Sequence, residues 1–123
     1  MKSIWFGLFI QIFAANAAMA SDDGWTASEL IGHEISLVSK TDIVTLSFGS
    51  ESWVSATLGT VGGPPPVGPV LRWKIDKVGV LIANDEYISL KIKKIRQNGD
   101  RYAVLISYND SPWEVAEFQK RKS

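Results

Sequence analysis

The sequence contains no cysteine, and this absence removes several classes of structure and function at once. Disulfide bonds, thiolate metal sites, cysteine nucleophiles and a lipid-modified N-terminal cysteine are all excluded. Small secreted domains of animals are commonly held together by disulfides. If this chain is exported, we therefore expect it in a bacterial periplasm or a bacterial extracellular space.

Histidine is almost as scarce, because His33 is the only one. A single histidine without cysteine cannot form the usual multi-histidine metal site. The chain also lacks a Gly-x-Ser-x-Gly nucleophile elbow and both glycine-rich phosphate-binding patterns. Asp85 and Glu86 are adjacent, but neighbouring strand residues point to opposite faces and make a poor acid–base pair. We expect no catalytic residue, no metal site, no cofactor and no enzyme activity.

The chain has no net charge, since 13 Lys and Arg residues balance 13 Asp and Glu residues. This balance argues against a nucleic-acid-binding function. The distribution is uneven: residues 21–70 carry six acids and one base, whereas residues 71–123 carry eleven bases and seven acids. The basic half offers either a patch for an acidic partner or a solvated outer face whose charges pair across strands.

The first twenty residues have the features of a secretory signal peptide. Lys2 supplies a positive charge, an apolar run extends over residues 4–13, and Ala18-Met19-Ala20 matches the small-x-small cleavage rule. An uncleaved membrane anchor is the alternative, but the apolar run is shorter than the roughly 20 residues that span a bilayer. We expect a signal peptide over residues 1–20 and one domain over residues 21–123, without stable membrane insertion.

After a short helical turn at Trp25–Ile31, apolar residues alternate with polar ones, a pattern typical of strands with one buried face. Asn98-Gly99 and similar turn signals separate the alternating segments. Lys93-Lys94 breaks the alternation and predicts a β-bulge. The predicted strands are Glu34–Ser39, Ile43–Ser50, Ser52–Gly59, Val70–Asp76, Gly79–Asn84, Tyr87–Ile95, Arg101–Asn109 and Trp113–Lys120.

Eight short strands joined by turns predict an all-β fold, an antiparallel meander that forms a sandwich or closes into a barrel. Closure removes exposed strand edges, so we expect an up-and-down barrel of about eight strands. The segment Thr60–Pro69 (TVGGPPPVGP) interrupts the meander, because three consecutive prolines impose polyproline geometry. It is either a functional loop at one end of the barrel or a linker between two halves of the sheet.

The aromatic residues, the proline segment and the basic strand faces supply the candidate binding residues. Trp73 shares its strand face with Leu71 and Ile75, which predicts a place in the core. Trp53 lies opposite the apolar face of its strand, so it is either exposed, as an anchor for a partner, or on a strand buried on both sides. The candidate ligand- or partner-binding residues are Trp53, Trp73, Tyr102, Gly63, Pro64, Pro65, Pro66, Arg72 and Lys74.

Four segments together resemble the small bacterial lipocalin-like barrels: Leu30-Ile31-Gly32, Val44–Phe48, Leu71–Asp76 followed by Gly79-Val80-Leu81, and Ala116–Lys120. This resemblance implies a closed barrel that binds a molecule without transforming it. Similar exported barrels hold small apolar ligands in the interior, or bind proteins through loops at the rim, as periplasmic lysozyme inhibitors do.

Two functions therefore remain open. The first is an exported, non-enzymatic binding protein that holds a small apolar ligand in, or at the mouth of, a lipocalin-like barrel. The second is a periplasmic protein–protein module, an enzyme inhibitor or an immunity-type protein. An interior cavity above roughly 300 Å³ would favour the first, and a filled core beside an exposed aromatic patch would favour the second.

Overall fold

The structure is a computed structural model of the chain, and it describes residues 24–122. The expected signal peptide at residues 1–20 lies outside the described residues. One short helix precedes eight strands: α2 (Ala27–Leu30), β1 (His33–Leu37), β2 (Asp42–Phe48), β3 (Trp53–Thr60), β4 (Val70–Ile75), β5 (Leu81–Asn84), β6 (Ser89–Asn98), β7 (Arg101–Tyr108) and β8 (Glu114–Lys122). Each strand begins and ends within three residues of its predicted limits.

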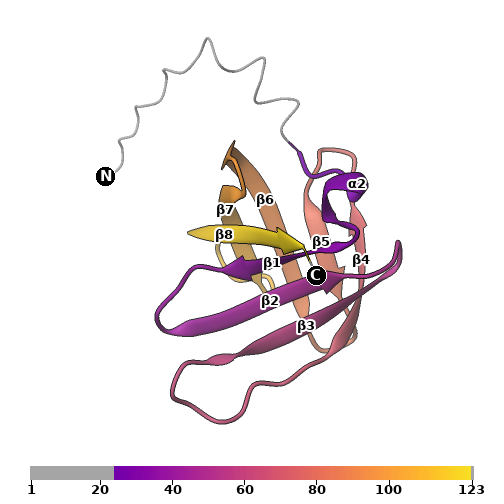
Figure 1. Cartoon of the computed structure of the whole chain (residues 1–123). Coiled ribbons are helices and arrows are strands. Elements are labelled where there is room, and N and C mark those ends of the chain that lie inside the picture. Colours follow the sequence, from indigo (N-terminus) through magenta and orange to yellow (C-terminus); the bar gives the residue numbers. More distant parts are fainter. Residues whose placement is uncertain (1–23, 123) are drawn as a thin grey trace.

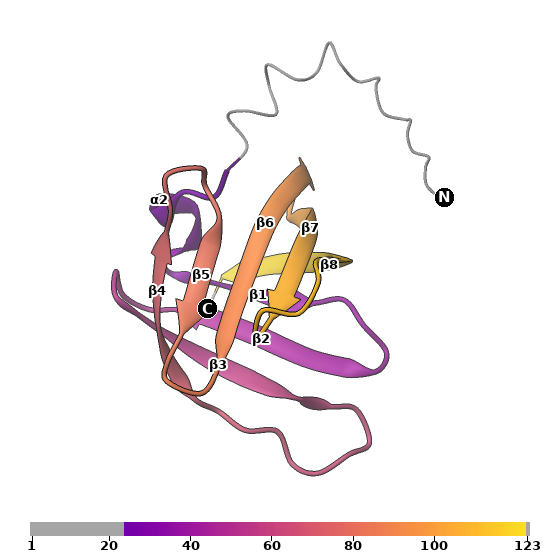
Figure 2. The same ribbon diagram turned by 180° about the vertical axis from the view of Figure 1, so that it is seen from behind.

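The strands form a closed barrel in chain order, as Figures 1 and 2 show. Each strand pairs antiparallel with the next one along the chain, and β8 pairs with β1 from His33↔Lys122 to Leu37↔Phe118. The predicted all-β antiparallel meander is confirmed, and it closes into a barrel of eight strands instead of packing as a sandwich. Among residues 24–122, no helix is long and apolar enough to cross a membrane.

The predicted β-bulge lies in β6, where the pairing with β7 shifts between Lys94 and Arg96. Ile95 is the additional residue, and its side chain is 44% exposed. Lys94 continues the inward face of Leu90 and Ile92, and after the bulge Gln97 pairs with the inward-facing Tyr102. The bulge therefore brings Gln97 to the barrel face that Lys94 already occupies by simple alternation.

The two ends of the barrel differ, and we name them the closed end and the mouth. The closed end carries α2 and the β2–β3, β4–β5 and β6–β7 turns, whereas the mouth carries the other four connections. Figure 1 shows α2 beside the β4–β5 turn and the long β3–β4 loop at the opposite end.

A contact between two glycines brings the N-terminal segment onto the closed end. The Trp25 N–H donates a 3.0 Å hydrogen bond to the carbonyl of Gly79 in the β4–β5 turn. A Cβ atom added to Gly79 would lie 2.6 Å from the Cα of Gly24, and Gly79 has a φ of +87°. Since both the spacing and the φ angle exclude larger residues, this crossing requires glycine.

On β2 and β8, inward-facing side chains become smaller from the closed end toward the mouth. Along β2 they run Phe48, Leu46, Val44, and along β8 Phe118 is followed by Ala116. The side chain of Trp25 joins those of Phe48 and Phe118 in the core at the closed end. The closed end is therefore filled, and unfilled space is left near the mouth.

Candidate functional site

A cavity of about 620 Å³ opens at the mouth, and we call it the mouth cavity. Inward-facing apolar side chains from six strands and from the β5–β6 turn form its walls: Leu37, Val44, Leu58, Ile88, Leu90, Ile106 and Ala116. Polar groups from the loops and strand ends complete the lining: Ser39, Asp42, Thr60, Tyr108, Ser111 and Glu114. The arrangement offers apolar walls with polar groups at the loops and strand ends, as ligand pockets usually do.

The mouth cavity has an acidic opening. Its lining contains two carboxylates, Asp42 and Glu114, and no lysine, arginine or histidine. The four mouth connections with their adjoining strand ends (residues 37–42, 60–70, 84–89 and 108–114) carry five acids against one base, Lys40. A bound molecule therefore meets a negative potential at the opening.

The rim of the mouth is also unusually apolar. Of the eleven exposed large apolar side chains among residues 24–122, eight lie in or beside the mouth loops. All four loop regions contribute: Val38, Val61, Val67, Val70, Tyr87, Tyr108, Trp113 and Val115. Exposed apolar groups gathered at one end of a protein are typical of a surface that contacts a ligand or a partner.

None of the nine predicted binding residues lines the mouth cavity. The segment Gly63–Pro66 lies exposed in the β3–β4 loop at the mouth, but only Val67 from this loop reaches the cavity. The loop turns back along β3, where Leu58 and Val67 exchange two backbone hydrogen bonds of 2.9 Å each. It is thus an extension of the β3–β4 hairpin at the mouth.

Four of the predicted residues meet elsewhere, on the outside of the barrel. Trp53, Arg72, Trp73 and Lys74 line a groove of about 470 Å³ on the outer face of β3, β4 and β5, which we call the outer groove. Trp53 is 46% exposed, so the first of its two predicted environments is the one observed. Trp73 is in the core as predicted, 7% exposed, with its ring edge-on to Phe48 at 5.0 Å.

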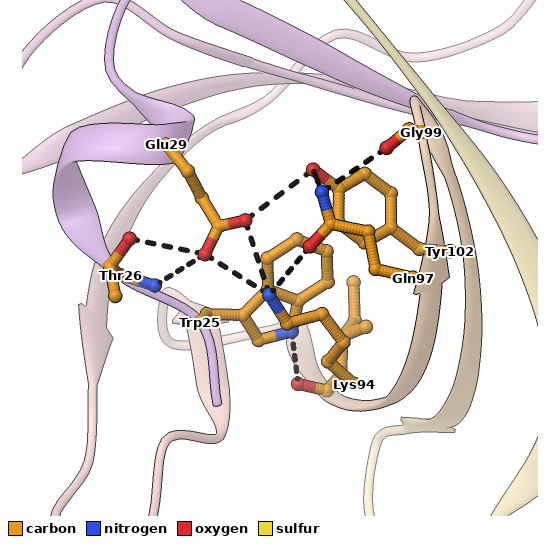
Figure 3. Close-up of polar contacts among 8 residues, drawn as sticks. Trp25, Thr26, Glu29, Lys94, Gln97, Gly99 and Tyr102 are labelled. Carbon is orange, nitrogen blue, oxygen red and sulfur yellow. Dashed lines mark hydrogen bonds and ion pairs between the residues drawn. The ribbon is translucent and has the colours of Figure 1, made fainter. Parts of the chain in front are cut away.

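The last predicted residue, Tyr102, belongs to a buried polar cluster at the closed end, shown in Figure 3. Its ring packs against Trp25 with the centroids 4.8 Å apart, and its hydroxyl donates a 3.4 Å hydrogen bond to Glu29. The Lys94 ammonium lies 3.2 Å from both carboxylate oxygens of Glu29. Only 6% of the Lys94 side chain and 18% of the Glu29 side chain are exposed. We call these four residues the latch, because they join the N-terminal segment to the barrel wall.

The protonation of the latch follows from its contacts. Burial alone would raise the pKa of Glu29, but hydrogen bonds from the Thr26 N–H and from Lys94 outweigh it and lower that pKa below 4.5. Burial raises the pKa of Tyr102; the Lys120 ammonium works against this, and the nearby Glu29 carboxylate adds to it. At neutral pH Glu29 is therefore a carboxylate that pairs with Lys94, and Tyr102 is a neutral phenol, an arrangement that fixes α2 in place.

The sequence reasoning missed both the mouth cavity and the latch. The taper from Phe48 to Val44 and from Phe118 to Ala116 was a readable signal for the cavity, because smaller inward residues leave space. No comparable signal marked Lys94, since a lysine beside a break in the alternation is normally solvated.

Other expected features have these positions. His33 is half-buried at the start of β1, and its Nδ1 lies 3.3 Å from the carbonyl of Ile31. Within residues 24–122, no group of three or more His, Cys, Asp or Glu side chains could hold a metal ion.

Comparison of the chain with protein-family models, curated proteins and solved structures finds no match. The eight-stranded closed barrel is compatible with a lipocalin-like architecture.

Proposed function

We propose that this protein is an exported, non-enzymatic binding protein of the lipocalin-like kind, located in a bacterial periplasm or secreted. Its ligand is a small apolar molecule held in the mouth cavity. The observation that carries the proposal is the cavity itself, about 620 Å³ with apolar walls, above a filled closed end. Pockets that take small molecules generally fall between about 300 and 1,000 Å³.

The charge of the mouth restricts the kind of polar end group that the ligand can carry. A carboxylate or phosphate on the ligand would face Asp42 and Glu114 with no cation in the cavity lining to compensate. A neutral or cationic polar end avoids this repulsion, and an ammonium group gains from it. The proposed ligand is therefore an apolar chain or ring system with a neutral or positively charged end.

Three amphiphiles with the same chain test this proposal: decylamine, decanol and decanoate. Each would be titrated against the purified mature protein carrying Nile red, a neutral apolar dye, and displacement of the dye would be followed by fluorescence. We expect the amine to bind most tightly and the carboxylate about tenfold more weakly. The double variant Asp42→Asn/Glu114→Gln should remove the difference between amine and carboxylate.

A substitution inside the cavity provides the decisive comparison. Ala116→Phe adds a ring to the cavity wall and should abolish binding of all three amphiphiles, because it fills space without removing a contact. Ala103→Phe is the matched control, since Ala103 alternates with the inward-facing Tyr102 and Val104 and so faces outward on the neighbouring strand. Failure of every amphiphile to bind, or unchanged binding by Ala116→Phe, would overturn the proposal.

The second candidate, a periplasmic enzyme inhibitor or immunity-type protein, is favoured by the apolar rim. Trp113 and Val115 are 45% and 79% exposed, and such side chains suit the centre of a protein interface. The two functions separate experimentally: Trp113 does not line the mouth cavity, so Trp113→Ser would weaken a protein complex and leave amphiphile binding in place. Export is tested independently by intact-mass spectrometry of protein recovered outside the cytoplasm. The measured mass should correspond to a chain that begins at Ser21.

A further inference from the structure

The outer groove has a chemistry different from that of the mouth cavity. Register places Trp53 opposite Arg72 and Arg72 opposite Asn84, while Lys74 lies opposite Ile82. These residues alternate with buried ones and so share the outer face of the barrel. With Ser52 and Trp73 they line a hollow of about 470 Å³ that combines hydrogen-bond donors with aromatic and aliphatic surface.

Within the described part of the chain, the two cations of the groove have no carboxylate partner. Three outward-facing bases on β6, β7 and β8 pair with acids: Lys91 with Asp110, Arg101 with Glu117, and Arg121 with Glu34. Among residues 24–122, neither Arg72 nor Lys74 forms an ion pair. Their charge is therefore available to an anionic ligand.

Trp53 adds an aromatic surface beside this charge. The Arg72 guanidinium lies 5.0 Å from the centre of the Trp53 ring, a cation–π contact that orders both side chains. Nearly half of the Trp53 side chain nevertheless remains exposed, at 46%. An ordered indole next to a guanidinium offers a stacking surface and a bidentate anion-binding group side by side.

We propose that the outer groove binds a sugar that carries an anionic group, either a carboxylate or a phosphate. The C–H groups on one face of a sugar ring are slightly positive and stack on the negative face of an indole. Arg72 and Lys74 bind the anion, and Asn84 and Ser52 form hydrogen bonds with hydroxyl groups. An acidic peptide fits less well, because the barrel has no free strand edge for its backbone and the groove offers Ile82 as its main aliphatic contact.

Three ligands with the same ring test the proposal: glucuronate, glucose 6-phosphate and glucose. They would be titrated in the millimolar range at constant ionic strength, and the Trp53 indole N–H would be followed by nitrogen-15 NMR. We expect glucuronate or glucose 6-phosphate to shift this signal with an affinity about tenfold above that of glucose. The stronger of the two identifies the source of the anion as a uronic acid or a phosphorylated sugar.

Variants then assign the effect to the groove. Arg72→Gln and Lys74→Gln should each weaken binding of the anionic sugar. Arg72→Gln should lower its affinity nearly to that of glucose. Lys122→Gln is the matched control, because it removes the same charge from an exposed position on β8, outside the groove. Thermal unfolding would confirm that all three variants remain folded.

Four results would overturn the proposal. They are the absence of any Trp53 shift, equal binding of glucose and the anionic sugars, equal loss of binding in Lys122→Gln, and tighter binding of a triglutamate peptide than of any sugar. The last result would assign the groove to an acidic protein partner instead.

Discussion

The latch makes a quantitative prediction about stability. Glu29→Gln keeps the shape of the side chain and an oxygen acceptor, but it leaves the Lys94 ammonium without a counter-charge at 6% exposure. Breaking a fully buried ion pair on one side costs about 3–5 kcal/mol, and the 18% exposure of Glu29 together with the retained acceptor reduces this to about 2 kcal/mol. For a domain of this size that cost lowers Tm by roughly 8–16 °C.

The opposite single variant should cost less. After Lys94→Met, the Glu29 carboxylate keeps hydrogen bonds from the Thr26 N–H at 2.8 Å, the Thr26 hydroxyl at 3.1 Å and the Tyr102 hydroxyl. We expect a loss of about 1 kcal/mol, because the remaining charge is still hydrogen-bonded and partly hydrated. The double variant Glu29→Gln/Lys94→Met should be no less stable than Glu29→Gln alone, which corresponds to a coupling energy of about 1 kcal/mol.

Urea unfolding followed by tryptophan fluorescence measures these free energies. Trp25 reports on the latch directly, since its ring centre lies 5.1 Å from the Lys94 ammonium. At an m-value of 1–2 kcal/mol/M, a loss of about 2 kcal/mol moves the midpoint by about 1–2 M. The reasoning fails if Glu29→Gln costs less than about 0.5 kcal/mol, or if the two single effects add without coupling.

The same pair predicts a dependence on pH. The pKa of Glu29 is lowered on folding, so below pH 4.5 the unfolded chain takes up a proton more readily than the folded one. The contribution of Glu29 is therefore complete above pH 4.5 and is lost as the pH falls through its folded-state pKa. The stability difference between the natural sequence and Glu29→Gln should shrink over the same range.

Two further predictions concern the glycine crossing and the exposed tryptophans. Gly79→Ala should destabilise the protein by about 1–2 kcal/mol more than Gly62→Ala, as measured by urea unfolding. Both glycines have positive φ, but only Gly79 has a neighbour within 4 Å. Equal losses of stability would show that the Gly24 contact is unimportant. Trp53 and Trp113 are almost equally exposed, but Trp53 lies beside positive charges and Trp113 lies at the acidic mouth. In Trp113→Phe, iodide should therefore quench the fluorescence of Trp53 more than caesium does. In Trp53→Phe, caesium should quench the fluorescence of Trp113 more than iodide does. Added salt should reduce both differences, and identical quenching of the two residues by each ion would contradict the assigned potentials.

Much of the fold was predictable because each strand has one dry face. The alternation in β4 and in the first half of β6 identified the strands and the core position of Trp73, and turn residues located the connections. The bulge was predictable as a break in the alternation, but the burial of Lys94 just before it was not. Lys94 continues the inward series of Leu90 and Ile92, and only the position of Glu29 on α2 makes that burial possible.

The candidate site was less predictable than the fold, for a physical reason. Sequence alternation shows which residues face inward, but it does not show how strands slide past one another around a barrel. That stagger decides which inward residues share a level, and so whether Val44, Leu90 and Ala116 surround a space or fill it. Trp53, Arg72 and Lys74 were found because exposure on adjacent strands can be read locally, whereas the mouth cavity combines residues from across the whole chain.

The seam between β1 and β8 has a consequence for how the barrel can form. It joins the first strand to the last, and its Glu34–Arg121 ion pair links residues 87 positions apart. Until β8 is available, β1 and β7 each present an unpaired edge, and the loop-closure entropy of the seam has not yet been compensated. Folding should therefore be slow for a chain of this length, and it should be complete only after the last strand has left the ribosome. A chain shortened before Glu114 should aggregate through these open edges. Pairing of the final nine-residue strand is therefore the step that commits the polypeptide to its native state.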